Sequence, residues 1–98
     1  MEKEYAKKAA GYFEVDGVCA AFVGLDAAAK AAEVSIEAVE RTRRNCFVCV
    51  KLRGSISDVE AAMQAALSAA GKIAALGNHG IIASPEEGTE EVLKLTNI

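Results

Sequence analysis

The sequence has little of the chemistry that binds metals or cross-links chains, since its 98 residues include one His and three Cys. An odd number of cysteines argues against a disulfide framework, so we expect reduced thiols. No apolar run approaches the roughly 20 residues that cross a membrane. The opening segment, MEKEYAKK, is charged and lacks the apolar centre of a signal peptide. We therefore expect a cytoplasmic protein.

Net positive charge and catalytic motifs are also missing. The formal net charge is −3, which gives no general attraction to nucleic acid or to an anionic membrane. The chain has no glycine-rich phosphate loop, no nucleophile elbow and no His/Glu set at metal-binding spacing. We expect no enzyme, no catalytic residue and no cofactor.

The residues that are present suit one small folded domain. Hydrophobic residues make up 52% of the chain and charged residues 26%, which is an ordinary balance for a globular protein. Much of the apolar fraction is alanine, whose short side chain lets helices lie close to a sheet. We expect a polar lead-in over residues 1–8 and a single domain over residues 9–98.

Periodicity predicts four strands and three helices in the order strand, helix, strand, strand, helix, strand, helix. Strand residues rich in Val, Phe and Tyr are followed by stretches whose apolar positions recur at helical intervals. The order predicts an α+β fold, a ferredoxin-like βαββαβ sandwich with two helices on one face of an antiparallel sheet and a short C-terminal helix. The predicted strands are 10–15, 34–42, 46–53 and 79–83, and the predicted helices are 18–33, 57–75 and 84–95.

Local signals place the ends of these elements. The spacing of Ser57 and Glu60 predicts a capping box at the start of the second helix. The pair at 77–78, Gly-Asn, predicts a turn. Pro85 is expected in the first turn of the last helix. Four glutamates of that helix are expected to face solvent: Glu86, Glu87, Glu90 and Glu91.

Several motifs resemble one known family. The segment GYFEVDG at 11–17 is similar to a G-x-[IV]-E-[TV]-x-G opening, and DAAAKAA at 26–32 is similar to a D-A-x-x-K-A-A helix end. The segment VKLRG at 50–54 carries an R-G step, and the alanine-rich stretch at 59–71 follows it. Across residues 9–87, these motifs resemble the shell domain of bacterial microcompartments in order and spacing.

The resemblance implies a structural role. Members of that family form six-fold rings that tile into flat sheets and wall off a compartment, together with other shell proteins. The ring axis is a pore lined by the loop between the second and third strands. In this sequence the resemblance assigns four residues to that loop: Arg43, Arg44, Asn45 and Cys46.

The arginines distinguish this loop from the small Gly-Ser-Gly run that is common in the family. A guanidinium stays charged near neutral pH, so six copies of two arginines would place up to about 12 positive charges around one axis. We expect the pore to attract small anionic metabolites. The alternative is that the arginines form a solvated turn, or that they pair with Glu37 and Glu40.

Cys46 and Cys49 form a C-x-x-C, which two readings can explain. Residues three apart in a strand point to opposite faces, so one chain does not aim both thiols at one ion. Copies of Cys46 could instead meet at the pore and hold an iron–sulfur cluster, and the alternative is a small residue in a tight loop.

A further possible function, besides a shell tile with or without a cluster, is that of a small ferredoxin-like anion-binding protein or enzyme. Such an enzyme would show turnover as a monomer.

Three further residues are assigned by the resemblance to the ring edge. Lys30 matches the lysine through which neighbouring rings meet, although a helix-end lysine facing the dipole is the alternative. Glu33 stands where an asparagine is common, and Ser84 stands where an arginine often precedes the proline. We therefore expect a shell component that needs a different partner tile to form extended sheets.

Overall fold

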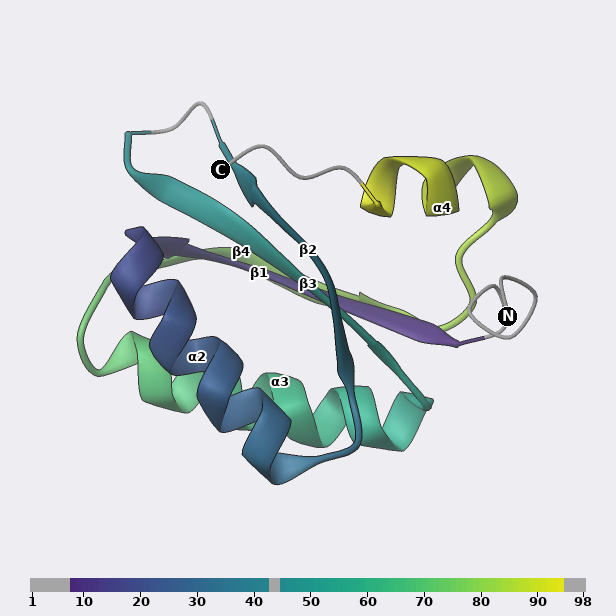
Figure 1. Ribbon diagram of the computed structural model, residues 1–98, viewed down its shortest axis with the longest axis horizontal. Helices are drawn as coiled ribbons and strands as arrows, with labels where there is room; N and C mark the ends of the chain where they lie inside the picture. The colour runs from purple at the N-terminus through teal and green to yellow at the C-terminus, as the bar shows by residue number, and fades with distance from the viewer. Residues whose placement is uncertain (1–7, 43–44, 95–98) are drawn as a thin grey trace.

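A computed structural model describes residues 8–42 and 45–94, and they form strands and helices in the predicted order. Helix labels follow Figure 1 and begin at α2. None of the described helices is long and apolar enough to cross a membrane. The elements are β1 (Ala9–Asp16), α2 (Val18–Ala31), β2 (Ser35–Arg41), β3 (Phe47–Gly54), α3 (Ile56–Gly71), β4 (Leu76–Ile82) and α4 (Glu87–Leu93).

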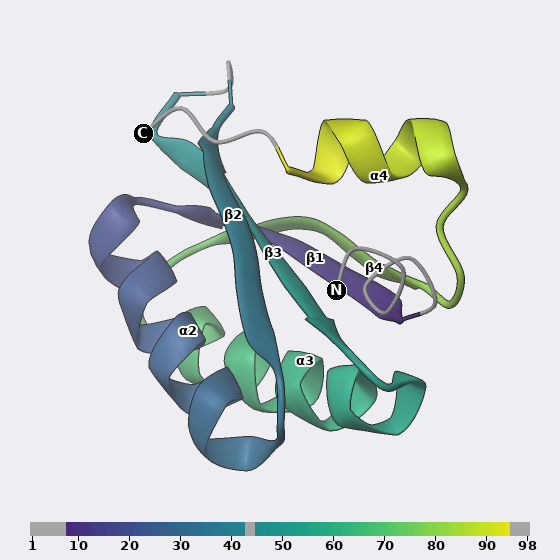
Figure 2. The ribbon, with the colours of Figure 1, turned by 45° about the vertical axis from the view of Figure 1, so that its right-hand side comes forward.

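The strands form one antiparallel sheet in the order β2-β3-β1-β4. Helices α2 and α3 cover one face of the sheet, and α4 lies on the opposite face (Figures 1 and 2). This arrangement confirms the predicted ferredoxin-like sandwich with a short C-terminal helix. The face under α2 and α3 is called the helix face below, and the other is called the α4 face.

The core lies between the sheet and the two long helices. Alternation along β3 sends Val48, Val50 and Leu52 into this core. Small residues let the layers approach closely. A Cβ added at Gly24 of α2 would stand 3.1 Å from the ring of Phe13 and 3.4 Å from Ala70 of α3. The alanine-rich composition is therefore a packing requirement, because larger side chains would separate the two helices.

The N-cap of helix α3 lies two residues earlier than the sequence indicated. Its N-cap is Ser55, whose hydroxyl accepts a hydrogen bond from the Asp58 N–H at 3.2 Å and donates to the Asp58 carboxylate at 2.9 Å. The predicted start at Ser57 is wrong because Ser55 has the extended backbone that a cap requires. The helix also ends at Gly71, before the predicted end at residue 75.

The predicted turn at residues 77–78 is also wrong, because both lie within β4. Asn78 donates its N–H to the Glu14 carboxylate at 2.9 Å, beside an irregularity in the β1–β4 register between Phe13 and Val15. A side chain at Gly77 would collide with Glu14. Glycine is therefore needed here for the close approach of β1, not for a turn.

The start of α4 corrects two further expectations. Pro85 is buried and precedes the N-cap Glu86, so it is not in the first helical turn. Glu90, expected in solvent, is also buried, whereas Glu86, Glu87 and Glu91 are exposed as predicted. Periodicity missed Glu90 because its burial depends on a charged partner in β3.

Candidate functional site

The loop between β2 and β3 lies at one end of the sheet. Of its four predicted residues, Arg43 and Arg44 lie outside the described residues. Asn45 and Cys46 are both exposed. Asn45 has φ 54°, a left-handed conformation that asparagine adopts more readily than most residues.

Hydrogen bonds fix the residues on both sides of the loop. Thr42 donates its N–H and its hydroxyl to the Phe47 carbonyl at 3.0 and 2.9 Å, which closes the hairpin. Gly17 donates its N–H to the Cys46 carbonyl at 2.9 Å, which ties the loop to the start of α2. The loop therefore begins and ends at anchored positions.

A hollow of about 370 Å³ lies beside the loop and brings a third arginine to it. A β-bulge between Ile36 and Ala38 shifts the alternation of β2 by one residue, so that Arg41 pairs with Val48 on the helix face. Sequence reasoning missed Arg41 because a bulge leaves no reliable sequence signal. The hollow is lined by Gly17, Val18, Arg41, Asn45, Cys46 and Val48.

The two glutamates suggested as partners of the loop arginines both bond to side chains of β3. Glu37 accepts from Arg53 Nε at 3.1 Å, and Glu40 accepts from Lys51 Nζ at 2.8 Å. Each carboxylate is thus already paired with a buried cation of β3 on the α4 face.

The cysteines lie in different environments. Cys19 and Cys46 are exposed, whereas Cys49 is half-buried on the α4 face. Burial raises the pKa of the Cys49 thiol, Lys51 opposes that rise, and nearby carboxylates add to it. No group of three or more His, Cys, Asp or Glu residues within the described part of the chain is placed to hold a metal ion.

The predicted edge residues lie at the other end of the sheet, where α2, β3 and β4 all end. Lys30 is exposed and pairs with Asp26 at 2.7 Å. Glu33 and Ser84 are exposed as well. Glu33 lines a hollow of about 540 Å³ together with Ala83, the neighbour of Ser84. The structure thus places the predicted edge residues and the loop at opposite ends of one sheet.

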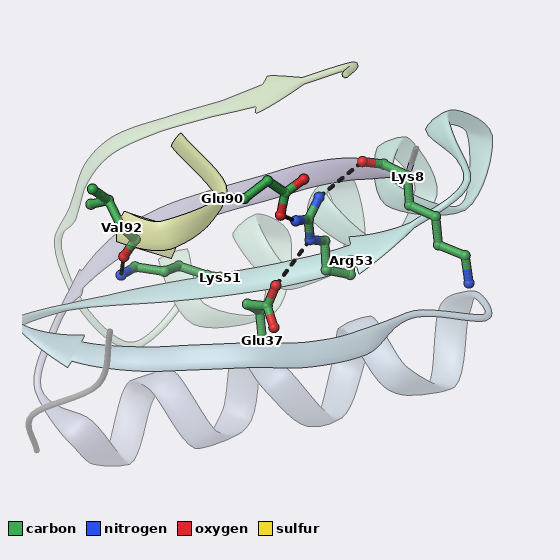
Figure 3. A network of polar contacts seen from close by, with 6 residues as sticks. All are labelled: Lys8, Glu37, Lys51, Arg53, Glu90 and Val92. Carbon is green, nitrogen blue, oxygen red and sulfur yellow. Dashed lines mark hydrogen bonds and ion pairs between the residues drawn. The ribbon is translucent and has the colours of Figure 1, made fainter. Parts of the chain in front are cut away.

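One buried feature was absent from the sequence interpretation. Lys51 and Arg53 are only 5% and 1% exposed, although they sit in a strand whose sequence reads as apolar. Both point to the α4 face, where β2 and α4 supply their partners (Figure 3). Two cations at alternate strand positions could have indicated a polar second face, because alternation puts them on one side of the sheet.

Comparison with known proteins identifies relatives of this chain. The family described as BMC domain matches residues 9–85. The chain is 30% identical over 82 residues to the bacterial microcompartment shell protein PduK of Citrobacter freundii, which matches 84% of this chain and 53% of the relative. It is 36% identical over 89 residues to the carboxysome shell protein CcmK2 of Synechococcus elongatus, covering 89% of this chain and 86% of the relative.

A solved structure shows the same fold. A microcompartments protein from Desulfitobacterium hafniense superposes with a TM-score of 0.75 at 17% identity, covering 95% of this chain and 50% of that one. The chain spans about half the length of that protein and of its PduK relatives. The family match over most of the chain places it, as the motifs indicated, in the BMC-domain family of bacterial microcompartment shell proteins.

Proposed function

We propose that this chain is a structural, non-catalytic tile of a microcompartment shell in the cytoplasm, and that six copies form a ring around the β2–β3 loop. The observation that carries the proposal is the placement of the loop and the predicted edge residues at opposite ends of one sheet. In a ring, one end of each subunit faces the axis and the other faces the next ring.

Exposed apolar side chains support a head-to-tail ring. Helix α2 and strand β2 lie on one flank of the molecule, and α3 and β4 lie on the other (Figures 1 and 2). Both flanks carry large exposed apolar residues, such as Phe22 at 56% and Ile73 at 62%. Two different flanks that pair with each other generate a cyclic ring when the rotation closes. The exposed apolar residues of these elements are Phe22 and Val23 of α2, Ile36 of β2, Ile56 of α3, Ile73 after α3, and Leu76 and Ile81 of β4.

The loop composition supports a pore for small anionic metabolites. Six copies of Arg43 and Arg44 supply up to about 12 positive charges, and six copies of Arg41 raise the total to about 18 before screening. Guanidinium groups keep this charge at every physiological pH. Asn45 and Cys46 complete the lining without adding a fixed charge.

Two measurements separate the parts of this proposal. Native mass spectrometry should give a six-subunit mass, and a monomer would contradict the tile. The double variant Arg43→Ala with Arg44→Ala should keep that mass and lower anion binding. Lys72→Ala, which removes an exposed cation after α3, is the matched control. A ring whose anion binding does not change would contradict the anionic pore and leave the tile intact.

The rim is proposed as the contact between rings and with other shell proteins. The exposed Lys30 can exchange its surface pairing with Asp26 for a group on a neighbouring ring, because exposed ion pairs are weak. Glu33 adds an acid at this rim, and Ser84 supplies no charge, so a partner tile with complementary charge is expected. Lys30→Ala should abolish sheets and leave the ring mass unchanged.

Cys46 offers one alternative, an iron–sulfur cluster held by several copies at the axis. Its exposed thiol in the loop is compatible with such a site, but each copy supplies a single cysteine there. We propose a pore without a cofactor. The protein purified without oxygen should be colourless and free of iron, and visible absorbance with bound iron would favour the cluster.

A further inference from the structure

Two buried cations lie on the α4 face of the sheet, at alternate positions of β3. The side chain of Lys51 is 6% exposed and that of Arg53 is 0% exposed. A buried cation is costly unless it is paired and hydrogen-bonded. The partners of these two residues therefore determine whether this face of the sheet stays stable without α4.

One set of partners comes from the sheet itself. Arg53 donates through Nε to Glu37 at 3.1 Å and through Nη1 to the Lys8 carbonyl at 2.9 Å. Lys51 donates to Glu40 at 2.8 Å. The bulge in β2 makes this possible, because Glu37 lies between register partners that flank the irregularity. Both cations thus keep a carboxylate partner even without α4.

A second set of partners comes from α4 alone (Figure 3). Arg53 forms an ion pair through Nη2 with Glu90, and Lys51 donates to the Val92 carbonyl at 3.5 Å. The other carboxylate oxygen of Glu90 is buried, and no hydrogen-bond partner for it is found in the described part of the chain. The α4 half of the network is therefore less completely bonded than the sheet half.

Helix α4 has few means of stability besides these contacts. It has seven residues and contains Gly88, and no side-chain hydrogen bond at its N-cap is present among the described residues. Isolated helices this short are unstable in water, and Gly inside a helix weakens it further. Only Glu90 and Leu93 of this helix are buried, while Val92 is 59% exposed. Segments of this kind open at a lower free energy than the whole domain.

We propose that the Lys51–Arg53 face is a carboxylate-binding site, that α4 fills it within the same chain through Glu90, and that it becomes available when α4 leaves. The cations stay paired with Glu37 and Glu40 in the open state, so opening leaves the sheet intact. Nη2 of Arg53 then donates outward to the position that Glu90 vacates. The ligand class is an acidic peptide that presents a glutamate and, three residues later, an apolar side chain, as α4 does with Glu90 and Leu93.

Amine labelling of Lys51 in the full-length protein tests the opening step. Glu90→Gln should raise the labelling rate of Lys51 by about tenfold or more, as expected for losing a hydrogen bond between charged groups. Glu91→Gln, which neutralises an exposed glutamate of the same helix, is the matched control and should leave the rate unchanged. The exposed Lys72 serves as the internal reference in every sample.

Leu93→Ala is a second variant that tests the opening of α4, and it leaves every charge in place. It too should raise the labelling rate of Lys51. The circular dichroism of both variants should match that of the parent. Equal Lys51 labelling in the parent, Glu90→Gln and Leu93→Ala proteins would overturn the opening step. An equal rise in Glu90→Gln and Glu91→Gln would also overturn it, because the effect would then follow net charge.

A synthetic peptide of residues 86–94 tests the binding site in trans. Added to the Leu93→Ala protein, it should restore protection of Lys51, and the same peptide with Glu90→Gln should not. Equal protection by both peptides, or protection by neither, would overturn the carboxylate site. These readouts depend on one chain and are unaffected if the ring proposal fails.

Discussion

The N–H of Gly17 donates to the carbonyl of Cys46 at 2.9 Å, and this bond joins the start of α2 to the end of the β2–β3 loop. Gly17 has φ 102°, a conformation that residues with a Cβ rarely adopt. Among the residues that the structure describes, a Cβ at this position would meet no atom within 4 Å. The requirement for glycine is therefore set by the backbone and not by space.

Gly17→Ala should consequently destabilise the protein through backbone strain. We expect a loss of about 1–2 kcal/mol in the free energy of unfolding, measured by urea denaturation. Gly88→Ala is the matched control, since it also adds a Cβ in open space but lies in a helix. That control should be neutral or slightly stabilising, by up to about 1 kcal/mol. Equal losses in the two variants would show that strain at Gly17 is not the cause.

The cap of α3 gives a second prediction with its own control. Ser55→Ala removes the hydroxyl that accepts from the Asp58 N–H, so unfolding should become easier by about 1 kcal/mol. Ser57→Ala removes a similar exposed hydroxyl inside the first turn and should change stability by less than about 0.5 kcal/mol. Thermal melting of both variants tests which serine is the N-cap of α3. A larger loss of stability in Ser57→Ala would show that Ser57 is the N-cap, as the sequence alone suggested.

Close packing of β1 against α3 gives a third prediction. A Cβ at Gly11 would stand 2.8 Å from Val59 and 2.9 Å from Met63, both of which are buried. Gly11→Ala should therefore cost about 1–3 kcal/mol, the usual effect of overpacking. Gly11→Ala should lower the free energy of unfolding by less in a Met63→Ala background than in the parent protein. Strict additivity of the two losses would rule out a clash at this contact.

Thiol reactivity gives a fourth prediction. Burial raises the pKa of Cys49 above its ordinary value of 9.0, so this thiol should alkylate more slowly at pH 8 than the exposed Cys19 and Cys46. Because the folded-state pKa is raised, the contribution of the neutral thiol to stability is present below pH 9 and is lost as the pH rises through the folded-state pKa. Mass spectrometry of partly alkylated protein measures the order of reaction. Alkylation of Cys49 first would contradict this assignment.

The sequence allowed the strand and helix order to be predicted because each element carries its own periodicity. Apolar residues at every second position predict a strand with one face on the core, and β3 has this pattern at Val48, Val50 and Leu52. The ends were less predictable. Ser55 and Ser57 each offer a plausible cap, and backbone conformation decides between them. Residues 77–78 look like a turn until the contact of Glu14 with Asn78 is known.

The candidate site was predictable only where it depends on local sequence. The break between two strands predicted a turn at Asn45, whereas Cys46 was predicted as the first residue of the next strand, and β3 begins one residue later, at Phe47. Arg41 was missed because a bulge in β2 changes the face on which it lies. The burial of Glu90 was missed because it requires Arg53, which is 37 positions away in the sequence. Contacts of this range depend on the fold, so periodicity within a segment does not reveal them.

The central claim is that six copies place their β2–β3 loops around one axis. An electron-microscopy map of the purified assembly that resolves the strands tests it directly. The predicted result is a six-fold ring in which the loop bearing Asn45 and Cys46 surrounds the axis, while Lys30 and Glu33 lie at the outer rim. A ring with these two ends exchanged, or a particle of one chain, would contradict the account.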